Sequence, residues 1–159
     1  MDFIITTVSK SNEDNEKYAH DLAKKLNKKY ILREKNSLEK LKQDNNIDNI
    51  LIVTKNGLKA HTKNGELFFH LNMAQLRILS IMRQQKDHMV EAMNLSSGMS
   101  VLDCTLGLGT DAVVASFIVG EKGKVVGLES SELIYLISKH GLENFRHDNI
   151  DIQKSLKCI

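Results

Sequence analysis

The chain has 159 residues, of which 42% are hydrophobic, which suits one ordinary domain or two small ones with a buried core. This composition argues against a wholly disordered chain, and apolar runs far below about 18 residues argue against a membrane span. The start, MDFIITTVSK, has no basic n-region, and Cys104 and Cys158 lack metal-ligand spacing, so we expect a reduced, cytoplasmic protein.

The net charge of +2 is the sum of two oppositely charged regions. Residues 1–86 carry 16 Lys and Arg against 10 Asp and Glu, whereas residues 87–159 carry 6 against 10. Much of the positive excess lies between Lys24 and Lys42. Two interpretations stay open: a solvated surface, or a face that contacts the phosphates of nucleic acid, with RNA as the partner.

Residues 1–70 predict a small N-terminal α/β block. Short β-branched and apolar runs predict its strands, and Ser11 and Ser37 can each cap a helix. Two Asn-Gly pairs then mark the turns of a hairpin. The predicted order is β-α-β-α-β followed by the hairpin, with strands at Phe3–Val8, Tyr30–Leu32 and Asn49–Thr54 and hairpin arms at Leu58–Thr62 and Glu66–His70.

Residues 71–97 predict a helical bridge between two blocks. Asp87 is a suitable cap for its second helix. The large apolar residues of its first helix share one face, where we expect them to pack between the blocks: Met73, Leu76, Leu79 and Met82.

Residues 98–159 predict a β-α-β-α unit with parallel strands and a right-handed crossover. The strands are expected at Ser100–Asp103 and Lys124–Leu128, and the helices at Thr110–Val119 and Ser131–His140. The last residues, DIQKSLKCI, are amphipathic and have no terminating turn, which predicts a helix that is cut short.

The stretch VLDCTLGLGTDA places a glycine loop between the first strand and the first helix of this unit. Its G-x-G-x-x-A pattern also satisfies the fingerprint of nicotinamide dinucleotide binding. However, Asp103 ends the strand before the first glycine and Asp111 lies in the first helical turn, and both carboxylates would repel a pyrophosphate. S-adenosylmethionine instead carries an ammonium and a sulfonium, which carboxylates attract, and its ribose hydroxyls suit Glu129 at the end of the second strand.

With these residues the unit resembles the class I S-adenosylmethionine-dependent methyltransferases, and within them the ribosomal small-subunit RNA methyltransferase J family and its Gram-positive relatives. The string D-x-T-x-G-L-G-x-D-A and the acidic residue after the second strand carry the resemblance. It implies S-adenosylmethionine as cofactor and a Rossmann-like α/β sheet, of which this chain holds the first half. The implied cofactor-binding residues are Asp103, Thr105, Gly107, Gly109, Thr110, Asp111, Glu129 and Ser130.

The resemblance also implies an RNA substrate, such as the N2 atom of a guanine in ribosomal RNA. Arg77, in the bridge, could reach a cofactor carboxylate or an RNA phosphate through charge-assisted hydrogen bonds. Cys104 is expected to be buried beside the glycine loop. No catalytic residue and no metal ligand can be named from the sequence.

A complete sheet of this family has more strands than the two that we expect here, and its Asp-Pro acceptor loop has no counterpart in a sequence without proline. We therefore expect an inactive fragment that forms a homodimer through an exposed sheet edge. Two other functions stay open: a non-enzymatic RNA- or protein-binding α/β module, and a nicotinamide-dinucleotide-binding domain.

Overall fold

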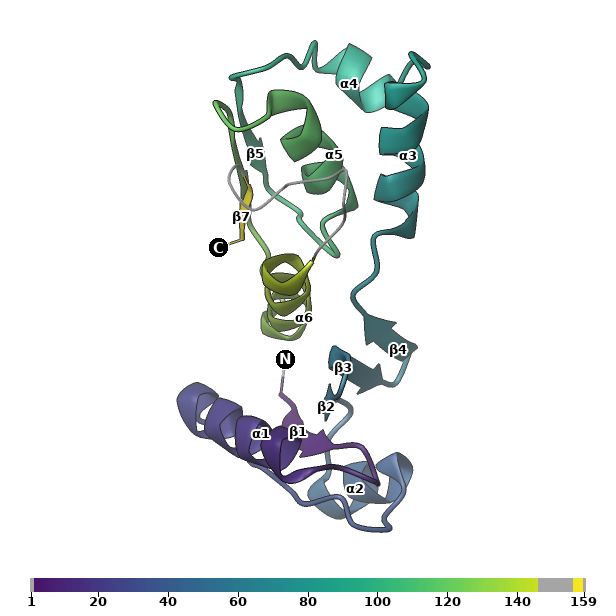
Figure 1. The fold of residues 1–159 in the computed structure, drawn as a ribbon. Helices are drawn as coiled ribbons and strands as arrows, with labels where there is room; N and C mark the ends of the chain where they lie inside the picture. The colour runs from purple at the N-terminus through teal and green to yellow at the C-terminus, as the bar shows by residue number, and fades with distance from the viewer. Residues whose placement is uncertain (1, 146–155, 159) are drawn as a thin grey trace. The chain divides into compact units, whose positions relative to one another are not determined.

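The computed structural model describes residues 2–145 and 156–158. It divides into two compact units, Met1–Phe69 and His70–Ile159, which are described in turn (Figure 1). Each unit has its own sheet with parallel strands and helices packed on it. The predicted α/β class is therefore confirmed, including a partial Rossmann-like sheet in the second unit.

The first unit is built on a four-stranded sheet in the order β1-β2-β3-β4. β1 and β2 are parallel, and β3 and β4 form the predicted antiparallel hairpin beside β2. The strands are β1 (Ile4–Thr7), β2 (Ile50–Thr54), β3 (Gly57–Thr62) and β4 (Gly65–Phe68).

The predicted strand at Tyr30–Leu32 is reduced to an isolated bridge between Tyr30 and Ile5 of β1. The Thr6 hydroxyl donates to the Ile31 carbonyl at 2.6 Å, and Glu34 then turns the chain with a positive φ of 48°. The ladder ends because a side chain, rather than the next backbone amide, bonds this carbonyl. The sequence predicted the position of the segment correctly but overestimated its extent.

Helices α1 (Glu13–Leu26) and α2 (Leu38–Asn45) complete the first unit. Ser37 caps α2 as predicted, but α1 is capped by Asn12, whose side chain accepts from the Asn15 amide at 2.9 Å, and not by Ser11. Asn12 has extended backbone geometry and a side-chain oxygen, which are the two requirements of a cap. The core between helix and sheet includes a cluster of Ile4, Leu41, Ile50 and Ile52.

The second unit contains a parallel three-stranded sheet in the order β5-β6-β7. Its strands are β5 (Ser100–Asp103), β6 (Lys124–Gly127) and β7 (Leu156–Cys158). The helix predicted over residues 151–159 lies outside the described residues except at Leu156–Cys158, where the prediction is wrong, and the expectation of two strands is wrong as well. β6 offers a free edge with a fully buried Val125 beside Leu156, and pairing there outweighs a weak amphipathic pattern.

The described part of this unit has four helices: α3 (Asn72–Met82), α4 (His88–Ala92), α5 (Thr110–Val119) and α6 (Glu132–Asn144). α5 contacts all three strands, and α3 and α4 contact α5 in turn. The interior of α5 is apolar on every side, as expected for a helix between a sheet and a second layer of helices.

The apolar face predicted for α3 is not its buried face. Ala74 and Ile78 are fully buried, and α3 packs against α5. The predicted packing residues are instead between 38% and 58% exposed: Met73, Leu76, Leu79 and Met82. They are exposed within the second unit, and their packing between the two blocks stays a prediction.

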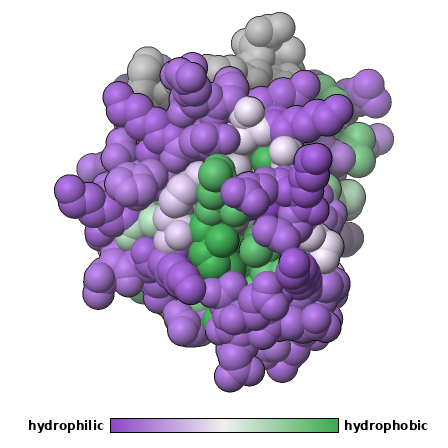
Figure 2. Space-filling model, turned by 90° about the horizontal axis from the view of Figure 1, so that it is seen from below, coloured by the Kyte–Doolittle hydropathy of each residue, from purple (hydrophilic) through white to green (hydrophobic). Residues whose placement is uncertain are grey.

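The face shown in Figure 2 is mostly hydrophilic, with hydrophobic residues gathered in a strip near its centre. Scattered exposed hydrophobic residues are normal for folded proteins. Among the described residues, no helix is long and apolar enough to cross a membrane.

Candidate cofactor site

The glycine loop of the second unit lies at the carboxyl ends of β5 and β6. Two backbone hydrogen bonds tie it to the loop after β6: Leu128 donates to the Asp103 carbonyl at 2.8 Å, and Leu106 donates to the Leu128 carbonyl at 2.9 Å. In parallel α/β sheets, ligands bind outside the carboxyl ends of the strands. The structure therefore brings the two predicted cofactor-binding segments together at the end of the sheet where a ligand is expected.

Glycines shape this loop at three positions. Gly107 and Gly109 have positive φ values of 53° and 82°, a region that side chains rarely allow, and Gly109 is the N-cap of α5. Gly127, at the end of β6, was not identified from the sequence. A Cβ atom there would lie 2.4 Å from a methyl carbon of the buried Leu106, so glycine at this position lets the loop fold over β6.

Glu129 connects the two loops through both of its carboxylate oxygens. Oε2 accepts from the Gly107 amide at 3.0 Å, and Oε1 accepts from the Ser131 amide at 2.8 Å. The first bond holds the glycine loop, and the second holds the N-cap residue of α6. Glu129 is therefore a structural brace of the site, and its half-buried carboxylate is fixed in direction.

The remaining predicted residues lie around this brace. Asp103, half-buried at the end of β5, accepts from the Thr105 amide at 3.0 Å and so forms a turn within the loop. Thr110 is the first residue of α5, and Ser130 is exposed directly after Glu129. Cys104 is exposed, so the expectation that it is buried is wrong: the turn at Asp103 directs the chain outward at this point.

Helix α6 supports the loop from behind through a residue that sequence analysis missed. The hydroxyl of the fully buried Ser138 donates to the Gly107 carbonyl at 2.6 Å. A Cβ on Gly109 would lie 3.6 Å from Leu142 of the same helix. Nothing in the sequence singles out Ser138, because a serine inside an apolar helix carries no pattern of its own.

Asp111, in the first turn of α5, forms an ion pair with Arg77 of α3. Arg77 Nη1 donates to Asp111 Oδ1 at 2.5 Å, while Nε and Nη2 donate to both oxygens of Asp87 at 2.7 and 2.9 Å. Asp87 also caps α4 by accepting from the Val90 amide at 3.2 Å. One guanidinium thus joins α3, the start of α4 and the start of α5.

This ion-pair network changes the pKa values of its members. Hydrogen bonds from Arg77 lower the pKa of Asp87 to about 2, and hydrogen bonds to Asp87 and Asp111 raise the pKa of Arg77 above its usual value. The side chain of Asp87 is 9% exposed, whereas that of Asp111 is 67% exposed. In this structure Arg77 binds both carboxylates, and its contact with a cofactor carboxylate or an RNA phosphate stays a prediction.

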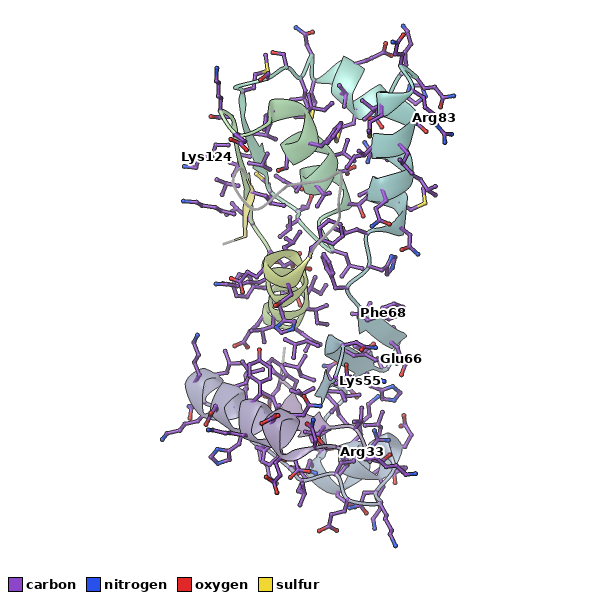
Figure 3. All side chains as sticks on the ribbon, viewed as in Figure 1. Arg33, Lys55, Glu66, Phe68, Arg83 and Lys124 are labelled. Carbon is purple, nitrogen blue, oxygen red and sulfur yellow. The ribbon has the colours of Figure 1, made fainter. Side chains whose placement is uncertain are left out.

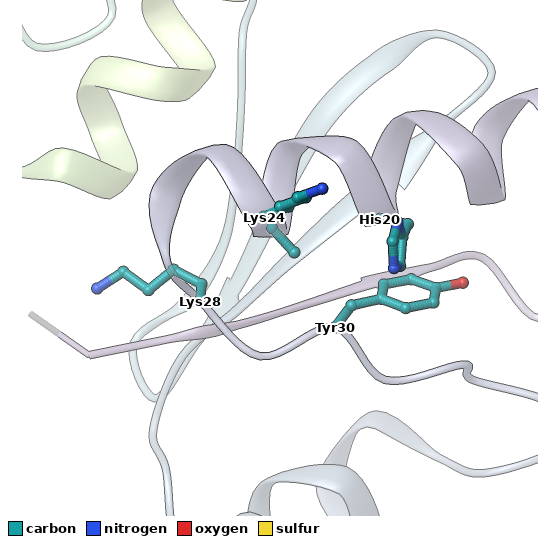
Figure 4. A pocket seen from close by; sticks show the side chains of 5 residues that line it. His20, Lys24, Lys28 and Tyr30 are labelled. Carbon is teal, nitrogen blue, oxygen red and sulfur yellow. The ribbon is translucent and has the colours of Figure 1, made fainter.

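A separate open hollow lies on the first unit, beside α1. It has a volume of about 470 Å³ and is lined by His20, Ala23, Lys24, Lys28 and Tyr30 (Figure 4). The rings of His20 and Tyr30 pack edge to face, with centroids 5.9 Å apart. Three of its lining residues, Lys24, Lys28 and Tyr30, belong to the Lys24–Lys42 stretch that the sequence singled out. Among the described residues, no group of three or more His, Cys, Asp or Glu is placed to hold a metal ion.

Comparison with known proteins identifies the family. The sequence model of the protein-L-isoaspartate (D-aspartate) O-methyltransferases matches residues 70–155, which is more than half of the chain. The chain belongs to this family. This family is one of the class I S-adenosylmethionine-dependent methyltransferases, as the glycine loop and Glu129 predicted, and its members use S-adenosylmethionine.

Individual relatives agree with this assignment. The uncharacterized protein YpiP of Bacillus subtilis is 38% identical over 157 residues, which are 98% of this chain and 61% of that protein. The chain thus spans less than two thirds of that relative. Protein-L-isoaspartate O-methyltransferases of Thermotoga maritima and Methanococcus maripaludis are 41% and 36% identical over 61 and 64 residues, or 19% and 30% of their own lengths. No solved structure matches the chain significantly.

The residues of this methyltransferase-family site fit S-adenosylmethionine. Each oxygen of Glu129 accepts one backbone hydrogen bond, and a carboxylate can accept about four, so capacity remains for the two ribose hydroxyls. Asp103 and Glu129 bring negative charge to the same end of the sheet, which favours the positive cofactor over a pyrophosphate. Because Arg77 pairs with Asp111, the argument against a pyrophosphate rests on Asp103 and Glu129.

Proposed function

We propose that this chain forms the cofactor-binding part of an S-adenosylmethionine-dependent methyltransferase. The observation that carries the proposal is the bracing of the glycine loop by Glu129, which holds a carboxylate at the carboxyl end of β6. Family membership supports the cofactor. The brace supports its orientation, because a fixed carboxylate binds two adjacent hydroxyls without losing conformational freedom on binding.

The roles of the individual residues follow from their positions. Glu129 would accept from the ribose hydroxyls, and Gly107 and Gly109 would let the cofactor approach the backbone without a Cβ clash. Asp103 would attract the positive charge of the methionine end, with Thr110 and Ser130 at either side of the site. S-adenosylmethionine supplies a sulfonium methyl group for in-line displacement, and these residues would hold it in one orientation for transfer.

Thermal unfolding with added ligand tests the cofactor. S-adenosylmethionine or S-adenosylhomocysteine at 100 times its dissociation constant should stabilise the chain by about 2.7 kcal/mol, and NAD should not stabilise it. Glu129→Ala should reduce the shift. Glu121→Ala is the matched control, because Glu121 precedes β6 and so lies at the opposite end of the sheet. Stabilisation by NAD and not by S-adenosylmethionine would refute the proposal.

The methyl acceptor is a finer proposal. The relatives from Thermotoga maritima and Methanococcus maripaludis are named for protein L-isoaspartate, which favours a protein carboxylate. RNA, with the N2 of a ribosomal guanine as acceptor, is the second candidate, supported by the lysine-rich stretch Lys24–Lys42 and its cationic hollow. We place the protein carboxylate first, because the family match covers more than half of the chain whereas RNA is supported by charge alone.

Salt titration of RNA binding tests the second candidate. Each neutralised phosphate releases counterions, so the logarithm of the binding constant should fall linearly with the logarithm of the salt concentration. Replacing Lys24 and Lys25 by Glu should reduce the slope by at least about 1.4, at about 0.7 per lost contact to single strands. The same change at Lys55 and Lys63, which lie at the hairpin turns, should leave it unchanged. Equal salt-dependence slopes for the two double variants would mean that Lys24 and Lys25 belong to a solvated surface and do not contact RNA.

A further inference from the structure

We propose that Arg77 is a positioning residue for the cofactor loop. It acts through Asp111, and the proposal therefore rests on the proposed function of that loop. Arg77 comes from α3, which precedes the glycine motif by more than one element and belongs to no part of the motif itself. Its guanidinium nevertheless bonds the one charged residue in the first turn of α5, immediately after the glycine loop.

The geometry of the pair gives Arg77 more than a charge-balancing role. The guanidinium binds Asp87 through two parallel hydrogen bonds at 2.7 and 2.9 Å, which fix its plane. With the plane fixed, the N–H groups of Nη1 have fixed directions, and Asp111 Oδ1 accepts from Nη1, while Nη2 also donates to Met89 Sδ at 3.7 Å. The more buried carboxylate therefore orients the arginine, and the arginine orients the exposed carboxylate.

The consequence for the site is a fixed carboxylate with one oxygen still available. Asp111 Oδ1 is bonded to Arg77, while the side chain as a whole remains 67% exposed, so Oδ2 can accept from a ligand. Without Arg77, an exposed aspartate in a helical turn would move among several rotamers and would also repel the neighbouring carboxylate of Asp87. Arg77 therefore lowers the entropic cost of binding a positively charged group of the cofactor at Asp111.

A double-mutant cycle distinguishes a positioning role of Arg77 from a purely structural role. Arg77→Met, Asp111→Asn and the double variant are compared with the wild-type chain for S-adenosylhomocysteine binding by calorimetry, beside their melting temperatures. Arg77→Met should weaken binding about tenfold, equivalent to 1.4 kcal/mol. In the Asp111→Asn background the same change should weaken binding less than twofold, because its effect passes through that carboxylate.

Two further variants keep the result interpretable. Arg77→Lys retains the charge but not the fork of donors, so it should recover only part of the affinity. Arg83→Met is the matched control, since Arg83 follows the last residue of the same helix and is exposed (Figure 3). It should bind S-adenosylhomocysteine as the wild type does.

Each outcome has a definite meaning. If the wild-type chain does not bind S-adenosylhomocysteine, the proposed function fails. If it binds and Arg77→Met lowers the melting temperature without changing the dissociation constant, Arg77 only joins helices and the inference is wrong. An equal loss of affinity with and without Asp111, tighter binding by Arg77→Met, or full recovery by Arg77→Lys would also overturn it.

Discussion

Single carboxylates in this chain are held in two different ways. Glu129 is held by backbone amides, which belong to the two loops that it joins. Asp87 and Asp111 are held by one arginine, which comes from a different helix. Half of the first arrangement is local, because Glu129 and Ser131 are two positions apart, whereas its bond to Gly107 spans 22 positions. The second requires the tertiary packing of α3 on α5 before any of its bonds can form.

The acid dependence of stability should report the Asp87 bond. The folded-state pKa of Asp87 is about 2, below its unfolded value of about 3.9. Its contribution is therefore fully present above about pH 4 and is lost as the pH falls toward 2. Asp87→Asn should lower the free energy of unfolding at neutral pH by about 1–2 kcal/mol and flatten its decrease between pH 4 and 2.

Denaturant titrations between pH 2 and 7 measure this effect. Asp44→Asn, an exposed carboxylate near the end of α2, is the control and should follow the wild-type profile. Parallel pH profiles for the wild type and Asp87→Asn would show that the bond between Arg77 and Asp87 does not stabilise the folded chain.

At the scale of elements, α3 shows that helical periodicity alone cannot choose between two faces. The face that includes Leu76 is exposed, and the face with Ala74 and Ile78 is buried. Side-chain size does not separate the two faces, because isoleucine and leucine have the same number of carbon atoms. The face that α3 turns toward α5, which itself packs on the sheet, is the buried one.

Paired truncations on α3 test which face is buried. Ile78→Ala should lower the free energy of unfolding by about 2–5 kcal/mol, because it opens a cavity against α5. Leu76→Ala, on the exposed face, should change it by about 0.5 kcal/mol or less. Denaturant unfolding of both variants gives the comparison. A larger loss for Leu76→Ala than for Ile78→Ala would mean that the exposed face is covered in solution.

At the scale of the whole molecule, the sheet of the second unit ends in an open edge. β5 is the terminal strand in the order β5-β6-β7, and in the described part of the chain nothing pairs with its outer side. Leu102 on this strand is 59% exposed. An open edge with an apolar side chain is a template for pairing with another chain.

We expect a homodimer through β5, as the sequence suggested. Sedimentation equilibrium of the wild-type chain should then give twice the monomer mass of 18.0 kDa. Leu102→Lys should give the monomer mass, because a charge on an edge strand opposes pairing. Leu32→Lys, an exposed leucine of the first unit, should remain dimeric. A monomeric wild type, or a dimeric Leu102→Lys, would contradict this expectation.

The sequence by itself determined the local features of the second unit. Strand Ser100–Asp103 and helix Thr110–Val119 lie as predicted, and the last helix begins within one residue of the predicted Ser131, because each depends on residues within about one turn or one loop. The glycine loop and its acidic residue could also be identified from the sequence, because positive φ angles favour glycine and a carboxylate at the end of a strand is visible as a residue type.

Only the tertiary structure decided which distant residues meet. Arg77 and Asp111 are 34 positions apart, and Ser138 and Gly107 are 31 apart, so neither pair leaves a local pattern. Leu156–Cys158 became a strand because β6 offered it a free edge, against its own amphipathic pattern. Local sequence preferences thus determined the helices, the strands and the cofactor loop. Contacts between these elements determined how the side chains around the loop are oriented and which charged groups pair.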